Sequence, residues 1–150
     1  MQNTTIDGPP TGAEHEAHGE TMLVLLEVAR RVQERLEAGL DAVGLSMAKY
    51  AALDALVAAH EPLTLSELAG RLHCVRSNIT QLVDRLESDG LVRRVGDPSD
   101  RRAIRAVVTE LGAERQAAGA TTLDRLQAEL AERVDPESRV ALHRALTALR

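Results

Sequence analysis

The sequence is poor in aromatic residues: Tyr50 is the only one, because phenylalanine and tryptophan are absent. Leucine, valine and alanine must therefore fill the interior, which favours packed helices over a β-sandwich. Cysteine is as scarce, since Cys74 stands alone and excludes a disulfide within the chain. One cysteine and no secretory signal peptide lead us to expect a cytoplasmic protein. The apolar stretch at residues 22–26 is too short, and too soon followed by charged residues, to span a membrane.

Positive charge is also in the minority, because the formal net charge of the chain is -5. Residues 71–105 are the exception, with a net charge of +3 from eight arginines and five acidic residues. The eight are Arg71, Arg76, Arg85, Arg93, Arg94, Arg101, Arg102 and Arg105. A positive patch on an acidic body can engage phosphate while the rest of the surface repels it. Charge alone would fit a solvated surface equally well, so the patch needs a motif to interpret it.

The length of 150 residues is that of one domain. Residues 1–19 are rich in glycine, proline, threonine and acidic residues and have almost no large apolar residue, which predicts a flexible tail. His15 and His18 lie in this tail and are interpreted as solvent-exposed, and we expect no metal site. Residues 20–150 form the predicted domain.

Sequence periodicity predicts a mainly α fold with one small β-hairpin, in the order α-α-α-α-β-β-α-α. Apolar residues recur every three or four positions over residues 20–43 and in the later helical segments. Capping residues mark the helix starts, namely Ser46, Thr64 with Glu67 three residues later, Thr109, and Asp135 before Pro136. Residues 92–108 alternate instead around the turn-rich GDPSD segment, which predicts the hairpin.

Residues 46–109 have the element order of a winged helix-turn-helix, which presents one helix and one hairpin to DNA. The prediction is a sequence-specific DNA-binding regulator. The fourth helix carries the base-reading candidates, because arginine can pair with guanine and asparagine or glutamine with adenine. These candidates are Arg76, Ser77, Asn78 and Gln81. Hydroxyl groups near helix starts can contact phosphate, and Thr64, Ser66, Ser77 and Thr80 provide them, although Thr64 and Ser66 can equally act as caps only.

The hairpin and its surroundings supply the remaining DNA-binding candidates: Arg85, Arg94, Asp100, Arg101 and Arg102. We expect Asp100 to pair with Arg102 and hold the loop in shape. Arg101 or Arg102 then reaches the minor groove or a phosphate, because a narrow minor groove concentrates negative potential.

The hairpin sequence resembles the wing of the MarR family of bacterial transcription regulators. That wing has an Asp-x-Arg pattern followed after five residues by Leu-Thr, and here Asp100-Arg101-Arg102 is followed by Val108-Thr109, with valine in place of leucine. Residues 78–90 resemble the recognition helix of the same family. The resemblance implies an obligate homodimer on a near-palindromic operator, with residues 20–43 and 110–150 as dimerisation helices. It also implies repression relieved by a small phenolic or lipophilic effector or by thiol oxidation.

Several other interpretations compete with this one. Cys74 lies in the turn before the recognition helix, where it is either a redox switch or a small apolar side chain of the interior. Metal sensing by His60, His73, Cys74 and His143 is disfavoured because their spacing matches no closed site. No glycine-rich phosphate loop, catalytic carboxylate pair or activated nucleophile indicates an enzyme, and no cofactor is expected. A winged-helix adaptor that binds protein instead of DNA remains the alternative function.

Overall fold

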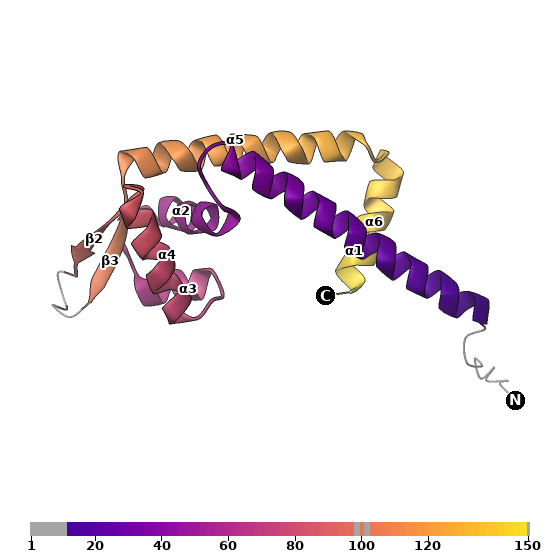
Figure 1. Ribbon diagram of the computed structural model, residues 1–150, viewed down its shortest axis with the longest axis horizontal. Coiled ribbons are helices and arrows are strands. Elements are labelled where there is room, and N and C mark those ends of the chain that lie inside the picture. Colours follow the sequence, from indigo (N-terminus) through magenta and orange to yellow (C-terminus); the bar gives the residue numbers. More distant parts are fainter. Residues whose placement is uncertain (1–11, 98–99, 101–102, 150) are drawn as a thin grey trace, which may run out of the picture. The chain divides into compact units, whose positions relative to one another are not determined.

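The computed structural model describes residues 12–97, 100 and 103–149, and for residues 12–18 the backbone only. Its order of elements is shown in Figure 1: α1 (Gly12–Asp41), α2 (Met47–Ala59), β1 (Leu63–Thr64), α3 (Leu65–Arg71), α4 (Arg76–Ser88), β2 (Val92–Gly96), β3 (Ile104–Val108), α5 (Glu110–Glu132) and α6 (Pro136–Ala148). The predicted mainly α fold with a hairpin is confirmed. Among the described residues, no helix is both long and apolar enough to cross a bilayer.

The first helix starts earlier than the sequence predicted. It begins at Gly12 and not at Glu20, so residues 12–19 belong to α1, while the predicted flexibility of residues 1–19 stays a prediction. The physical reason is local. This segment has no apolar stripe, but its alanines and glutamates favour a helix. Acidic residues near a helix start also interact favourably with the positive end of the helix dipole. Residues 1–11 and the side chains of His15 and His18 lie outside the described residues.

The chain divides into two compact units, residues 1–35 and 36–150. In the first unit, Arg30 pairs with Glu27 at 3.0 Å and with Glu34 at 2.5 Å, and Arg31 pairs with Glu27 at 2.6 Å. Hydrogen bonds from Arg30 and Arg31 lower the pKa of Glu27 to about 2. The apolar side chains Met22, Leu23, Val24, Leu26 and Val28 are exposed on the same helix segment. The charged side chains Glu27, Arg30, Arg31 and Glu34 of this segment are therefore paired with one another, whereas its large apolar side chains are exposed.

In the second unit, an aliphatic core joins α2, α3, α4 and the sheet. Its largest fully buried side chains are Leu40, Leu53, Leu68, Ile79, Val83, Leu86 and Val92. All the predicted caps are confirmed: Ser46, Thr64, Thr109 and Asp135 each accept a hydrogen bond from a backbone N–H three residues later. These caps fix where the helices start.

The sheet has three antiparallel strands in the order β1-β3-β2, one more than the sequence predicted. Strands β2 and β3 form the expected hairpin, with Val92 opposite Val108 and Gly96 opposite Ile104. The additional strand β1 pairs Thr64 with Arg105. Two residues are too short to show an alternating pattern, which is why β1 was missed. Its consequence is that the wing is hydrogen-bonded to the start of α3.

Two glycines of α5 mark close contacts. A Cβ on Gly112 would lie 2.0 Å from the carbonyl oxygen of Leu91, and a Cβ on Gly119 would lie 2.7 Å from the ring of Tyr50. Real Cβ atoms do not approach other atoms so closely, so any side chain here would push α5 away. The low helix propensity of glycine is thus offset by packing.

Candidate nucleic-acid interface

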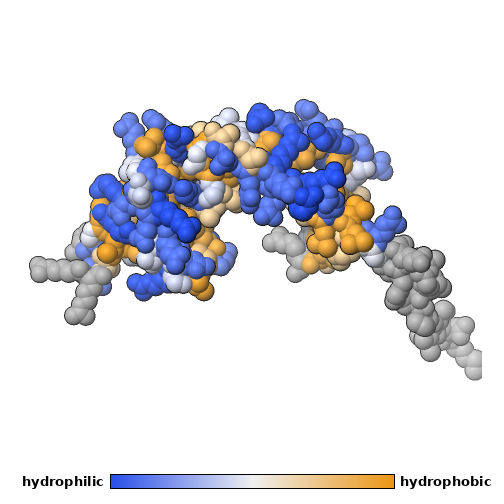
Figure 2. All heavy atoms as spheres, viewed as in Figure 1, coloured by the Kyte–Doolittle hydropathy of each residue, from blue (hydrophilic) through white to orange (hydrophobic). Residues whose placement is uncertain are grey.

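Helix α4 presents a polar face to solvent. It follows a tight turn in which His73 has a positive φ of 50° and the N–H of Cys74 donates to the carbonyl of Ala69 at 3.1 Å. Its apolar residues Ile79, Val83 and Leu86 are fully buried. The predicted reading residues Arg76, Ser77, Asn78 and Gln81 are all exposed, as are Thr80 and Arg85. Figure 2 shows hydrophilic side chains over the visible face of α3 and α4.

Three exposed arginines of α4 and β2 have no partner among the described residues. Arg76 and Arg85 lie on α4, and Arg93 lies on β2. An unpaired and exposed guanidinium can bind phosphate without first breaking an ion pair. These side chains therefore form a set of available positive charges along α4 and the first wing strand.

Arg94 has a different environment from its neighbour Arg93. Its guanidinium bonds to Asp84 and to Glu87, each at 2.5 Å, and its backbone N–H donates to Glu87 at 3.1 Å. Burial opposes the charge of Arg94, but the hydrogen bonds to both carboxylates outweigh it and raise the pKa of the guanidinium. The side chain thus ties β2 to α4, and its predicted contact with DNA stays a prediction.

The hydroxyl groups near the helix starts differ in availability. Thr64 Oγ1 is engaged twice with Glu67, accepting from its backbone N–H at 3.2 Å and donating to its carboxylate at 2.8 Å. Thr80 Oγ1 donates to the carbonyl of Arg76 at 3.1 Å. Ser66 and Ser77 are exposed and have no such contact among the described residues. The cap at Thr64 is confirmed, and a phosphate contact there remains a prediction.

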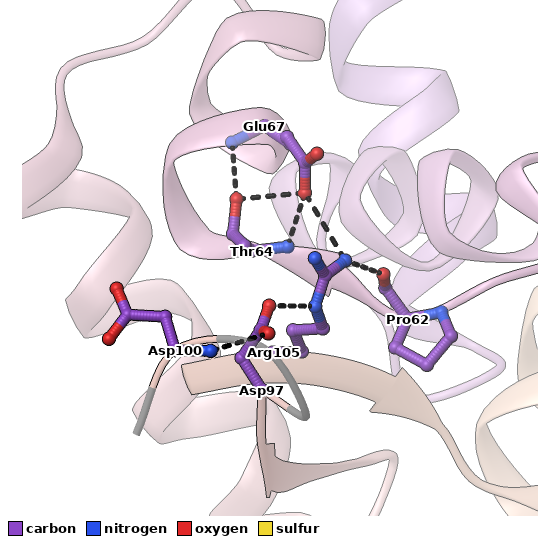
Figure 3. A network of polar contacts seen from close by, with 6 residues as sticks. All are labelled: Pro62, Thr64, Glu67, Asp97, Asp100 and Arg105. Atoms are coloured by element: carbon purple, nitrogen blue, oxygen red, sulfur yellow. Dashed lines mark hydrogen bonds and ion pairs between the residues drawn. The ribbon is translucent and has the colours of Figure 1, made fainter. Parts of the chain in front are cut away.

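The base of the wing contains an ion pair that the sequence did not predict. Asp97 is the one buried charged residue in the described part of the chain, and its Oδ2 accepts from Nε of Arg105 at 2.5 Å (Figure 3). This hydrogen bond, opposed by burial, raises the pKa of Arg105. The sequence offers one signal, an aspartate before proline at the start of a turn, but nothing in the strand pattern singles out Arg105.

The predicted wing contacts are only partly covered by the structure. Arg101 and Arg102 lie outside the described residues, so the expected pair between Asp100 and Arg102 stays a prediction. The side chain of Asp100 is exposed, and its backbone N–H donates to Oδ1 of Asp97 at 3.1 Å. Asp97 is therefore the aspartate seen to hold the loop backbone.

Cys74 is half-buried and borders a hollow beside the reading face. The hollow measures about 400 Å³ and is lined by Ala48, Ala51, Leu72, Cys74, Asn78, Gln81, Leu82 and Arg85. The thiol therefore lies close to the helix that carries the reading residues, as its position in the turn predicted. Within the described residues, no group of three or more histidine, cysteine, aspartate or glutamate side chains could hold a metal ion.

A buried helix with an exposed polar face, preceded by a short capped helix and followed by a hairpin fixed at its base, defines the winged helix-turn-helix class. Residues 45–104 match the model of one family in this class, the MarR family. Over this region the chain is similar to the MarR family.

The similar proteins agree with this match. The chain is 33% identical over 92 residues to the HTH-type transcriptional regulator PrsX of Escherichia coli, covering 61% of this chain and 55% of that protein. The chain thus spans about half the length of the curated relative.

Two solved structures show the same fold. The organohalide-sensing RdhR transcriptional regulator in its 2,4-dichlorophenol-bound form has a TM-score of 0.76 at 21% identity, over 99% of this chain and 88% of that one. A mutant MarR from Escherichia coli complexed with operator DNA has a TM-score of 0.71 at 23% identity, over 84% and 90%.

Proposed function

We propose that the protein is a sequence-specific DNA-binding transcription regulator. The observation that carries the proposal is the exposed polar face of α4, with Arg76, Ser77, Asn78 and Gln81 on one side and the buried Ile79 and Val83 on the other. The similar MarR mutant bound to operator DNA supports it. Nothing in the described site resembles a catalytic arrangement, so we assign no enzymatic activity, and a promoter-binding protein of this kind acts in the cytoplasm.

In this proposal α4 enters the major groove. Asn78 and Gln81 pair with adenine and Arg76 with guanine, because these side chains match the donor and acceptor pattern of those bases. Arg85, Arg93, Ser66 and Ser77 bind phosphates and set the register. Arg101 and Arg102 reach the minor groove next to it.

The protein acts as a homodimer in this proposal. Helix α6 exposes Val140, Leu142 and Leu146, and Leu149 directly after it is exposed as well. Large uncovered apolar surfaces are rare on monomers, and a second copy would cover them on this helix and on the apolar residues of α1. Two recognition helices would then meet successive major grooves about 34 Å apart, on a near-palindromic operator.

The regulator represses transcription in this proposal and is released by a small phenolic or lipophilic effector. The dichlorophenol-bound form of the similar RdhR regulator supports this class of ligand. Thiol oxidation at Cys74 is the other release mechanism that we carry forward. Full release by a phenol in Cys74→Ser protein would exclude a requirement for the thiol.

Selection of bound duplexes from a random pool tests the function. A regulator enriches a near-palindromic sequence, and its affinity falls steeply with salt because phosphate contacts release counterions. A winged-helix adaptor that binds only protein would enrich no sequence and show no salt dependence. Light scattering at micromolar concentration tests the dimer in the same preparation.

A further inference from the structure

Arg105 lies at the base of the wing and contacts three segments of the chain (Figure 3). Its Nε donates to Oδ2 of Asp97, its Nη1 donates to the carbonyl oxygen of Pro62 at 2.8 Å, and the same nitrogen lies 3.8 Å from Oε2 of Glu67. Asp97 opens the wing loop, Pro62 precedes β1, and Glu67 belongs to the capping box of α3. One guanidinium therefore joins the wing to the start of the helix-turn-helix.

Asp97 links Arg105 to the backbone of the wing loop. Its side chain is only 4% exposed, and its Oδ1 accepts from the backbone N–H of Asp100. The backbone N–H of Asp97 donates to the carbonyl oxygen of Ala103 at 3.0 Å, and the backbone N–H of Ala103 donates to the carbonyl oxygen of Asp100 at 2.9 Å. These contacts hold the chain on both sides of residues 101–102, where the wing arginines stand in the sequence.

The ion pair between Arg105 and Asp97 fixes an orientation as well as a distance. A guanidinium is planar with its donors in fixed directions, so a bond to a carboxylate and a second bond to a carbonyl fix an orientation as well as a distance. A carboxylate that is almost buried also depends on its cation, because an unpaired buried charge is strongly disfavoured. Loss of Arg105 therefore forces Asp97, and the loop attached to it, to move.

We propose that Arg105 is a positioning residue for DNA binding, which sets the place of the wing loop relative to α3 through Asp97 and Pro62. Its guanidinium is engaged inside the base of the sheet, unlike that of the exposed and unpaired Arg93. The proposal rests on the proposed function, since the position of the wing matters only if the wing contacts DNA.

The first measurement is the affinity of the full-length Arg105→Met protein for the duplex that the wild type selects. Methionine keeps an apolar stem but has no donors, and we expect about tenfold weaker binding by a folded protein. Lys49→Met is the matched control, because Lys49 of α2 pairs with Asp89 at 2.6 Å and neither residue belongs to the proposed DNA-binding set or to the dimerisation helices. It should leave the affinity unchanged.

The second measurement separates positioning from direct contact or general damage. In a background with Arg101→Ala and Arg102→Ala, the wing has lost its own contacts, so Arg105→Met should cost less than about twofold. An equal loss in both backgrounds would overturn the proposal.

A second variant and the wild-type result complete the test. Asp97→Asn keeps the size of the side chain and an oxygen that can accept from the N–H of Asp100. It should also weaken DNA binding, but by less than Arg105→Met does. It replaces Arg105→Met if that protein does not fold. If the wild type selects no duplex, the proposed function fails and this inference with it. If the wild type binds and folded Arg105→Met or Asp97→Asn binds equally well, the inference alone fails.

Discussion

The arginines of α4 and those at the base of the wing sheet have opposite environments. Arg76 and Arg85 on α4 are exposed and have no carboxylate partner among the described residues. Arg94 on β2 and Arg105 on β3 are partly buried and each bonds to carboxylates of the same unit. The first pair can neutralise phosphate, whereas the second pair holds the wing in place.

The difference shows that a local charge count overstates the charge that meets DNA. The net charge of residues 71–105 does not tell which arginines are available, because it gives equal weight to a free guanidinium and to one already bonded to a carboxylate. The salt dependence of DNA binding should follow the free arginines only. Substitutions in the two groups should therefore differ in kind as well as in size.

The largest effect in this comparison is expected for Arg76→Ala. The loss of a bidentate contact to guanine should weaken operator binding by about 1–3 kcal/mol and relax the preference at one base position. Repeating the duplex selection with the variant measures both. An unchanged preference at every position would assign Arg76 to phosphate and remove it from the reading set.

A smaller and more uniform effect is expected for Arg93→Ala. As a free arginine on the wing strand, Arg93 should bind phosphate, so the variant should lose affinity equally for specific and unrelated duplexes. The slope of log affinity against log salt concentration should fall by about one. Titrations at several salt concentrations measure this slope, and Lys49→Ala on α2 serves as the control. A slope equal to that of the wild type would contradict the assignment.

The helices could be predicted from the sequence because their signals are local. Ser46, Thr64 and Thr109 cap neighbouring residues, so each start depends on three or four positions in a row. The ion pairs that Arg94 and Arg105 each form with carboxylates could not be predicted in this way. Both depend on contacts with residues that only the folded chain brings close, such as Pro62, which lies 43 positions from Arg105 in the sequence. The strand β1 was missed because its two residues are too few to show an alternating pattern.

Arg94→Met should affect stability more than DNA binding. The partner carboxylates are 57% exposed at Asp84 and 39% exposed at Glu87, so solvent screens the ion pairs and the loss should be at most about 1 kcal/mol. Chemical denaturation measures the stability, and the salt slope of DNA binding should match that of the wild type. A slope reduced as in Arg93→Ala would show that Arg94 meets phosphate and would remove the distinction between the two groups.

The smallest effect concerns Glu67, which joins the capping box of α3 to the wing base. A hydrogen bond from the backbone N–H of Thr64 at 2.7 Å, followed by one from its hydroxyl, holds the pKa of Glu67 below its ordinary value of 4.5. A carboxyl whose pKa is lowered by folding contributes stability above its unfolded pKa and loses that contribution as the pH falls through the folded pKa.

Glu67→Gln should therefore have a slightly lower Tm than the wild type at pH 7, and the difference should shrink as the pH falls below about 4.5. Thermal unfolding of both proteins from pH 7 to pH 3 measures it. Glu114→Gln on the exposed surface of α5 is the control and should show no such trend. A difference in Tm that stays constant over this range would mean that the glutamate charge adds nothing to the cap.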